Sequence, residues 1–202
     1  MDKKIGVNTM NENDLREKII DASRNIFAKF GFKKTTMNEI ASAVNRAKSS
    51  IYHYYKSKEE IFEKVLEKEE EELKKQISNA VEQESLPQRK LYAYIKTKMQ
   101  NLNHLVNFYT ILKDEYLGRH YQFIEKIKER YRQYEFEVIK NILHSSIQQG
   151  GLRDEHIEDT AFTITIALKG FEPSAFNKHD PGKIESYINK LSGILFKGIK
   201  QE

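Results

Sequence analysis

A short segment of the sequence gathers side chains that can bind phosphate groups. Residues 44–61 read VNRAKSSIYHYYKSKEEI and include one Arg, three Lys, three Ser, three Tyr and one His. Ammonium and guanidinium groups neutralise phosphates, and hydroxyl groups add hydrogen bonds to phosphates or to base edges. The segment is therefore either an ordinary solvated helix end or a surface on which a polyanion lies.

The excess positive charge of the chain is concentrated around this segment. Residues 1–60 hold 12 basic and 8 acidic residues, whereas residues 61–202 hold 22 of each. Between residues 33 and 58 the charged side chains are Lys33, Lys34, Arg46, Lys48, Lys56 and Lys58 against Glu39. A charge run alone is typical of a solvated face, so the spacing of the surrounding elements has to decide between the two interpretations.

The elements that precede the segment are predicted to be helices. Apolar residues with helical spacing predict a helix over residues 14–30, which Gly31 ends. Thr36 and Glu39 have the spacing of a capping box. They predict a helix of about two turns that ends near Asn45.

Two further helices complete the arrangement. A short helix is predicted over residues 48–54, and Ser57 with Glu60 opens another that continues to about residue 83. Two short helices separated by residues 45–47 are typical of a helix-turn-helix, whose second helix enters the major groove of DNA. With this spacing, nucleic-acid binding is favoured over a solvated face. Ile51 is expected to anchor the second helix inward.

The remainder of the chain is also predicted to be helical. Apolar residues recur with helical spacing over 88–104, 105–117, 119–148, 155–171 and 181–200, and no segment alternates for long enough to form a strand. The expected fold is all-α, with about nine helices. We expect a helix-turn-helix DNA-binding domain over 1–57, in which 1–12 form a flexible arm. A larger domain over 58–202 would follow, with the helix 58–83 as the link.

Several classes of protein are disfavoured by what the sequence lacks. It contains no Cys, no HExxH, and no GxGxxG, GxxxxGK[ST] or GxSxG motif. We therefore predict no metal site, no cofactor and no enzymatic activity. No run of about 18 apolar residues and no secretory leader is present, so a cytoplasmic protein is expected.

Taken together, these motifs resemble those of transcriptional regulators of the TetR family. The resemblance rests on Ile20, Ala22 and Phe27, on FGFKKTTMNEIASAV (30–44) and on KSSIYHYYKSKEEIF (48–62). The rest of the chain is similar in outline only. The resemblance implies a homodimer that binds a palindromic operator in double-stranded DNA. It implies foremost a repressor, which a small molecule releases from DNA.

The resemblance also implies roles for single residues. Thr36, Tyr54 and Lys58 match positions that contact phosphates, and residues of the second short helix match positions that contact bases and backbone. The predicted DNA-binding residues are Lys34, Thr36, Arg46, Lys48, Ser49, Ser50, Tyr52, His53, Tyr54 and Lys58.

The turn departs from the pattern Gly-Val-Ser that is common in the family. Asn45 replaces the glycine and tolerates the left-handed conformation, so the turn can survive. Arg46 replaces a residue that usually packs inward, so it is expected to turn outward. Ala47 lacks the hydroxyl that would cap the next helix, a loss of about 1 kcal/mol.

Two further sites are expected in the larger domain. The predicted ligand-binding residues are Asn103, Asn107, Phe108, Tyr109, Leu112, Tyr116, Tyr121, Phe123 and Phe136, and core packing is the alternative for each aromatic residue. The ligand would be a small, largely apolar or aromatic molecule with a polar end. The predicted dimer residues are Thr163, Ala167, Gly170, Leu191 and Leu195.

Alternatives remain for the whole chain and for one charged segment. The chain could be a helical interaction protein that has lost specific DNA binding, or a small-molecule enzyme with a pocket in the larger domain. The acidic run Glu69 to Glu72 is expected to be a solvated helix face, and the alternative is that it repels DNA.

Overall fold

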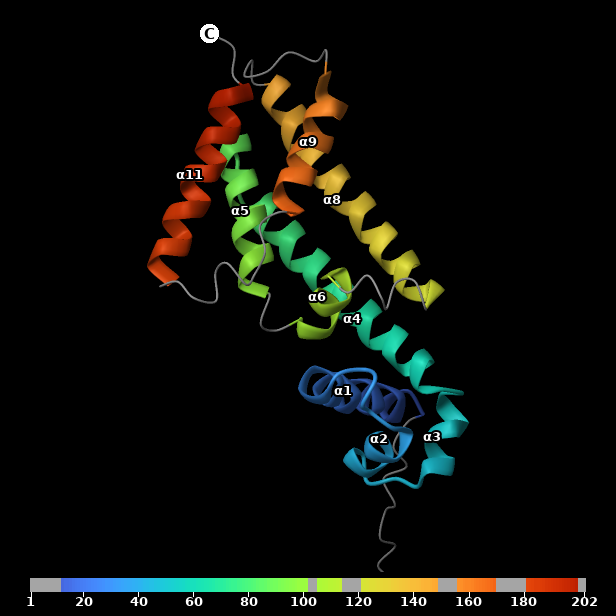
Figure 1. The fold of residues 1–202 in the computed structure, drawn as a ribbon. Helices are drawn as coiled ribbons and strands as arrows, with labels where there is room; N and C mark the ends of the chain where they lie inside the picture. The colour runs from blue at the N-terminus through green and yellow to red at the C-terminus, as the bar shows by residue number, and fades with distance from the viewer. Residues whose placement is uncertain (1–11, 102–104, 114–120, 149–155, 170–180, 200–202) are drawn as a thin grey trace, which may run out of the picture. The chain divides into compact units, whose positions relative to one another are not determined.

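The computed structural model describes residues 12–101, 105–113, 121–148, 156–169 and 181–199. Every regular element in these ranges is an α-helix, which confirms the predicted all-α class. The helices are α1 (Glu12–Phe30), α2 (Met37–Ala43), α3 (Lys48–Tyr54), α4 (Lys58–Glu82), α5 (Pro87–Gln100), α6 (Val106–Lys113), α8 (Gln122–Gln148), α9 (Ile157–Lys169) and α11 (Pro181–Ile199) (Figure 1). None of these helices is long and apolar enough to cross a membrane. Asn103, Tyr116 and Gly170 lie outside the described residues.

The chain divides into two compact units, Met1–Glu69 and Glu70–Glu202. Helix α4 contributes its first three turns to the first unit and the rest to the second. Ile61, Phe62 and Val65 of α4 are buried in the N-terminal unit, so the start of α4 belongs to its core. The expected domain boundary at residues 57 and 58, with α4 as the link, stays a prediction.

The N-terminal unit is held together by an apolar core between α1, α2, α3 and the start of α4. Helix α2 packs against both α1 and α3. The ring of Phe62 stacks on Phe32 at 4.6 Å and meets Phe27 edge-on at 4.8 Å. Gly31 joins α1 to this cluster with a φ of 79°, which glycine adopts without strain. These contacts fix where the two short helices begin.

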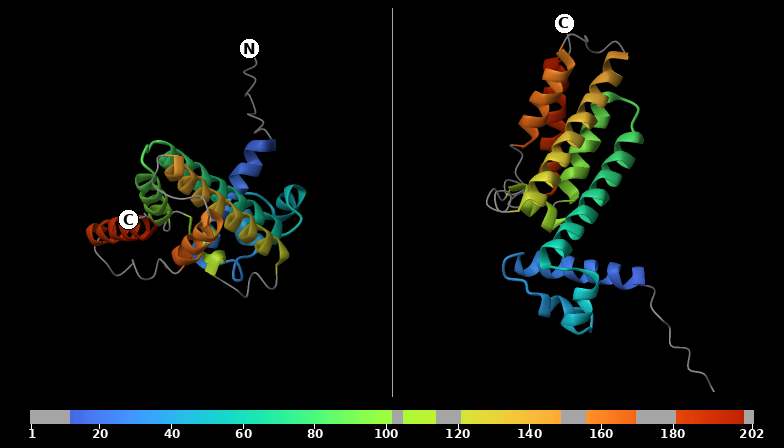
Figure 2. Two further views of the ribbon diagram at one scale, coloured as in Figure 1. Left: turned by 90° about the horizontal axis from the view of Figure 1, so that it is seen from above. Right: turned by 90° about the vertical axis from the view of Figure 1, so that its right-hand side faces the viewer.

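The C-terminal unit is a helical bundle. Helix α5 packs against α8 and α11, and α8 packs against α9 and α6. Figure 2 shows these long helices running alongside one another. Phe108 of α6 is fully buried, and its ring lies edge-on to Tyr131 of α8 at 4.9 Å. Phe108 therefore occupies the core of the bundle, the alternative left open for the aromatic residues of this region.

The expectation of a solvated acidic face was wrong for half of the run. Glu69 and Glu70 are 0% and 1% exposed, whereas Glu71 is exposed. Arg24 of α1 donates to Glu69 through Nε at 3.1 Å, within the N-terminal unit. In the C-terminal unit, Arg130 of α8 binds both carboxylate oxygens of Glu70, and Lys74 lies 2.5 Å from the same carboxylate. Paired arginines compensate the loss of hydration that burial imposes on each carboxylate.

Candidate nucleic-acid interface

The turn between α2 and α3 closes with the hydrogen bonds of a Schellman motif. Asn45 has a φ of 53° and donates from its backbone N–H to Ser42 O at 3.1 Å. Arg46 donates from its backbone N–H to Ala41 O at 2.9 Å. Both bonds satisfy carbonyls at the end of α2 that would otherwise lack partners. The expected left-handed conformation of Asn45 is confirmed, and the side chain of Arg46 is exposed as predicted.

The start of α2 is fixed by the capping box that the sequence predicted. Thr36 Oγ1 accepts from the backbone N–H of Glu39 at 3.3 Å. The carboxylate of Glu39 accepts in return from Thr36 N at 2.7 Å and from Thr36 Oγ1 at 2.9 Å. Thr36 remains exposed beside Lys34, which is also exposed.

Helix α3 has one buried face and one polar face. Ile51 is fully buried, whereas Lys48, Ser49, Tyr52 and His53 are exposed. The predicted residue Ser50 is half-buried. The Nζ of Lys48 lies 5.8 Å from the ring centre of Tyr52, so the ammonium and the phenol stand together on the exposed face. A helix with this division can lie in a groove while Ile51 holds it to its own domain.

Arg16 of α1 holds the end of α3, a role that the sequence did not reveal. Its Nη1 donates to the carbonyl of Tyr54 at 3.0 Å, and its guanidinium lies 5.4 Å from the ring centre of Tyr54 and 5.6 Å from that of Tyr55. Burial raises the pKa of Tyr55, and the nearby charge of Arg16 partly opposes this rise. Tyr54 is half-buried, and Arg16 fixes its ring from one side.

The ammonium of Lys58 points into its own domain. It donates to the carbonyls of Phe32 at 2.8 Å and Thr35 at 2.9 Å, and it lies 4.5 Å from the ring centre of Phe32. A third carbonyl, that of Lys33, is 3.5 Å away. An ammonium has three donors, so these bonds engage most of its hydrogen-bonding capacity. Lys58 therefore positions the segment before α2.

The other cations between residues 33 and 58 face solvent. Lys33, Lys34, Arg46, Lys48 and Lys56 are exposed around α2 and α3. Glu39 is the single acidic residue between residues 33 and 58, and its carboxylate is held in the capping box. The surface around α3 is consequently positive. Such a surface attracts phosphates and raises the rate of association with DNA.

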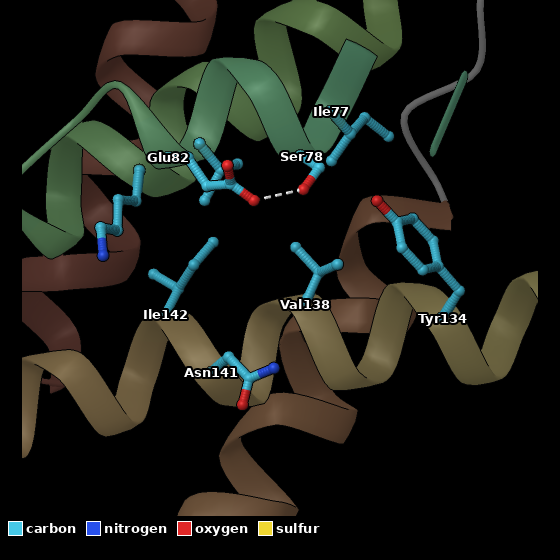
Figure 3. A pocket seen from close by; sticks show the side chains of 9 residues that line it. Ile77, Ser78, Glu82, Tyr134, Val138, Asn141 and Ile142 are labelled. Atoms are coloured by element: carbon cyan, nitrogen blue, oxygen red, sulfur yellow. Dashed lines mark hydrogen bonds between the residues drawn. The ribbon is translucent and has the colours of Figure 1, made fainter. Parts of the chain in front are cut away.

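In the C-terminal unit, a groove lies between α4 and α8. It has a volume of about 300 Å³ and is lined by Ile77, Ser78, Val81 and Glu82 of α4, Lys90 of α5, and Tyr134, Val138, Asn141 and Ile142 of α8. Figure 3 shows Ser78 and Glu82 of α4 on one side of this space, with Val138 and Ile142 of α8 directed toward them from the other. Sequence reasoning missed this groove because it followed the aromatic residues of the larger domain, whereas one of the nine residues that line the groove, Tyr134, is aromatic.

None of the predicted ligand-binding residues lines this groove. Asn107 and Phe108 are buried, and Tyr121, Phe123 and Phe136 are half-buried. Nothing is described for the side chains of Tyr109 and Leu112. The ligand role of these residues stays a prediction. No group of His, Asp or Glu within the described ranges is arranged to hold a metal ion.

Two of the predicted dimer residues lie on an exposed apolar face. Thr163 and Ala167 of α9 are exposed, and they lie beside Phe162 and Ile166, which are 59% and 50% exposed. On α11, Tyr187 and Ile194 are also exposed, and Leu191 is half-buried. The side chain of Leu195 is not described. Large apolar side chains that face solvent are typical of surfaces that another chain covers.

With this geometry in view, comparison with known proteins gives consistent matches. The pattern of the family "Bacterial regulatory proteins, tetR family" matches residues 19–65. The uncharacterised HTH-type transcriptional regulator YhgD of Bacillus subtilis is 25% identical over 194 residues, which are 92% of this chain and 97% of YhgD.

Two further matches cover about a quarter of the chain and most of its length, respectively. IcaR of Staphylococcus epidermidis, the HTH-type negative transcriptional regulator of the biofilm operon icaADBC, is 40% identical over 53 residues, which are 26% of this chain and 29% of IcaR. A solved structure from Clostridium perfringens, described provisionally as a fatty acid metabolism regulator, is 26% identical. It superposes with a TM-score of 0.63 and covers 92% of this chain and 100% of that one.

Proposed function

Because the chain is a transcriptional regulator of the TetR family, we propose that it is a homodimeric repressor with two N-terminal units that bind the half-sites of a palindromic operator. The observation that carries this proposal is that α3 has a buried apolar face and an exposed polar face. Ile51 is buried, whereas Lys48, Ser49, Tyr52 and His53 are exposed. Repression is favoured because IcaR, a negative regulator, is 40% identical over 53 residues.

The proposed contacts follow from the groups that face outward. Arg46, Lys48 and Lys34 supply charge to phosphates, and Thr36 and Tyr54 supply hydroxyl groups. Ser49, Ser50, Tyr52 and His53 lie along α3, where side chains reach base edges in the major groove. Lys58 takes part by positioning Thr36, since its ammonium is bonded to the carbonyl of Thr35.

The first test is fluorescence anisotropy with labelled duplex DNA from the region upstream of the gene, titrated at several salt concentrations. We expect affinity for this duplex to exceed that for random DNA by about 10³ or more, with log affinity falling linearly in log salt. Lys48→Ala is expected to weaken binding by about tenfold and to reduce the salt slope by about one. Tyr54→Phe removes only the hydroxyl and is expected to weaken binding less.

A matched control separates a specific effect from a general loss of charge. Lys126 is exposed on α8, so Lys126→Ala removes the same charge from the C-terminal unit. It is expected to leave affinity and salt slope unchanged. Equal losses for Lys48→Ala and Lys126→Ala would contradict the proposed interface. Equal weak binding to both duplexes would contradict specific recognition of this upstream DNA.

We also propose that α9 and α11 form the dimer contact. Phe162, Ile166, Tyr187 and Ile194 together expose an apolar surface that a second copy would bury. Ile194→Glu is expected to shift sedimentation toward the monomer and to weaken operator binding, because two half-sites are then no longer linked. Leu86 is 60% exposed at the start of α5, and Leu86→Glu is the matched control that should remain dimeric.

The effector that we propose is largely apolar, with a polar end. The similar Clostridium perfringens structure supports this class, because it is described provisionally as a regulator of fatty acid metabolism. Effector binding would favour a conformation whose two α3 helices no longer match half-sites about 34 Å apart. A molecule that binds tightly but leaves the operator affinity unchanged would contradict this part of the proposal.

A further inference from the structure

We propose that the groove between α4 and α8 is the effector site and that it takes an aliphatic chain with an anionic head group. This inference rests on the proposed function in one respect, namely that a small molecule controls DNA binding. The volume of about 300 Å³ lies at the lower end of the range of small-molecule sites.

The body of the groove suits an unbranched or lightly branched apolar chain. Ile77 and Val81 of α4 and Val138 and Ile142 of α8 line the groove, so each of the two helices contributes aliphatic side chains to it. Ile77 and Ile142 are buried, and Val81 and Val138 are half-buried. A bound chain would therefore remove the remaining exposed surface of both valines from water, which favours binding.

The polar groups of the groove favour an anion. Ser78 donates to the carboxylate of Glu82 at 2.6 Å, so these two groups satisfy each other (Figure 3). Lys90 is half-buried, and among the described residues no side chain forms an ion pair or hydrogen bond with its ammonium. Asn141 also borders the groove, but it is exposed, and in Figure 3 its amide points away from α4. Of the two charged side chains that line the groove, Glu82 is bonded to Ser78 and Lys90 is not paired within the described residues, so the group left to bind a ligand is a cation that donates hydrogen bonds.

A second polar cluster of the C-terminal unit consists of side chains that pair with one another. Between α5 and α8, Tyr94 donates to the buried carboxylate of Glu135 at 2.7 Å, and Lys98 forms an ion pair with the same carboxylate. The ammonium of Lys98 also lies 5.8 Å from the ring centre of Tyr131. In this cluster the charged groups are paired with each other, whereas the groove between α4 and α8 contains a cation that is not paired within the described residues.

The groove is also connected to the ion pairs that hold α4 to α8. Tyr134, which lines the groove, donates from its phenol to the carbonyl of Lys74 at 3.1 Å. The ammonium of Lys74 lies 5.1 Å from the ring centre of Tyr134 and 2.5 Å from the carboxylate of Glu70, to which Arg130 is bound. The hydrocarbon chain of a ligand that enters between α4 and α8 would therefore displace Tyr134 and disturb the contacts that fix α4 immediately after Glu69.

The test measures binding and DNA release separately on the full-length protein. Isothermal titration calorimetry with decanoate reports binding, and anisotropy of the labelled operator reports release. Decan-1-ol and decyltrimethylammonium, used below their micelle concentrations, keep the chain and change the head group. We expect decanoate to bind at least about tenfold more tightly than either of these probes, a difference of about 1.4 kcal/mol.

Variants assign the binding to the groove. Lys90→Gln is expected to weaken decanoate about tenfold and to leave decan-1-ol unchanged, because only the head-group partner is lost. Val138→Trp fills the groove and should weaken both probes. Arg89→Gln removes a neighbouring exposed charge that does not line the groove, and it should change neither. Thermal unfolding of each variant verifies that it is folded.

The outcomes separate this inference from the function on which it rests. Decanoate binding that neither Lys90→Gln nor Val138→Trp weakens would overturn the assignment to the groove, as would a lack of decanoate binding. Tighter binding of decyltrimethylammonium than of decanoate would overturn the anionic head group and indicate Glu82 as the partner. If decanoate binds with the expected pattern among the variants but does not release DNA, the groove is a binding site, and its regulatory role is contradicted. Absence of operator binding would contradict the proposed function alone.

Discussion

Glu69 and Glu70 are consecutive residues of α4, both are buried, and each is paired with an arginine of a different unit of the chain. Glu69 accepts from Arg24 of α1 at 3.1 Å, and Glu70 accepts from Arg130 of α8 at 3.0 and 3.1 Å. Successive residues of a helix point about 100° apart, so adjacent side chains can serve different neighbours. Two adjacent glutamates thereby fix one helix within each of the two units.

We predict that loss of Arg24 destabilises the N-terminal unit strongly. Arg24→Met leaves the carboxylate of Glu69 buried beside an apolar side chain, and the expected cost is about 3–5 kcal/mol of unfolding free energy. Urea unfolding at pH 7 measures it. Adding Glu69→Leu should recover much of the loss, because the buried charge is then removed as well.

The exposed ion pairs beside this contact provide its control. Lys68 of α4 lies 2.7 Å from Glu17 and 2.8 Å from Asp21, and both acids are largely exposed. Lys68→Met should therefore change the unfolding free energy by less than about 1 kcal/mol. A cost for Arg24→Met no larger than that for Lys68→Met would show that burial of Glu69 does not matter for stability.

Substitutions of Lys58 and Lys56 are expected to affect different properties, namely stability for Lys58 and DNA binding for Lys56. Lys58→Met loses hydrogen bonds from a charged donor to the carbonyls of Phe32 and Thr35, so we expect about 2 kcal/mol of lost stability. Lys56→Met should leave stability unchanged, because its side chain is exposed. If Lys56 contacts a phosphate, its loss reduces the salt slope of operator binding by about one. The opposite pattern, with a flattened slope only for Lys58→Met, would assign the phosphate contact to Lys58.

The conformation of Asn45 predicts a specific ranking of substitutions. Asn45→Ala places a residue without a polar side chain at a φ of 53°, and we expect a loss of about 1 kcal/mol. Asn45→Gly should be nearly neutral, because glycine adopts this conformation freely. Asn38→Ala, on the exposed face of α2, is the control for loss of an amide in a helix. Thermal unfolding distinguishes the three, and equal values for Asn45→Ala and Asn45→Gly would exclude backbone strain as the cause.

A capping residue at position 47 should stabilise α3. Ala47 occupies the N-cap with extended backbone angles and makes no side-chain hydrogen bond to the helix. Ala47→Ser supplies an acceptor for the free backbone N–H groups of the first turn, with an expected gain of about 1 kcal/mol. Ala43→Ser, at the end of α2, lacks such an N-cap position and should bring no gain. Hydrogen exchange of the α3 amides reports the difference directly.

Tyr134 makes stability depend on pH in the alkaline range. Burial raises the pKa of its phenol to about 12, with contributions from the charges of Glu135 and Glu82. The folded chain then keeps a proton that the unfolded chain releases near pH 10, so this stability is complete below pH 10 and is lost as pH rises toward 12. The expected loss is below about 2 kcal/mol, because the phenol is only half-buried and solvent screens part of the effect. Tyr134→Phe should abolish this pH-dependent loss of stability. Urea unfolding at several pH values between 9 and 12 measures it for both proteins. If the unfolding free energy fell equally with pH in both, the pKa of Tyr134 would not be raised.

The helices could be predicted closely because their signals are local. Thr36 with Glu39 and Ser57 with Glu60 mark helix starts within four residues of sequence, and at both places the backbone N–H of the glutamate donates to the hydroxyl oxygen as expected. Gly31 and Asn45 mark the ends by their positive φ angles. Local hydrogen bonding therefore accounts for the accuracy in the N-terminal unit.

The parts that could not be predicted depend on residues distant in sequence. Burial of Glu69 and Glu70 requires Arg24 and Arg130, which are 45 and 60 positions away. No local pattern distinguishes these glutamates from the exposed Glu71. The inward orientation of Lys58 likewise depends on carbonyls 26 and 23 positions away. The aliphatic side chains that α4 and α8 contribute to the groove cannot be distinguished in the sequence from ordinary core residues.

The bonds of Lys58 also bear on how the N-terminal unit forms. Helices α2 and α3 have seven residues each, well below the length at which an isolated helix persists in water, about 12–15 residues. By joining residues 32 and 35 to residue 58, the ammonium closes a ring of chain that contains both helices and the turn. Closing this ring costs conformational entropy once, and that single cost orders α2, the turn and α3 together. The two helices should therefore appear and open as one folding unit, with a common free energy of amide exchange.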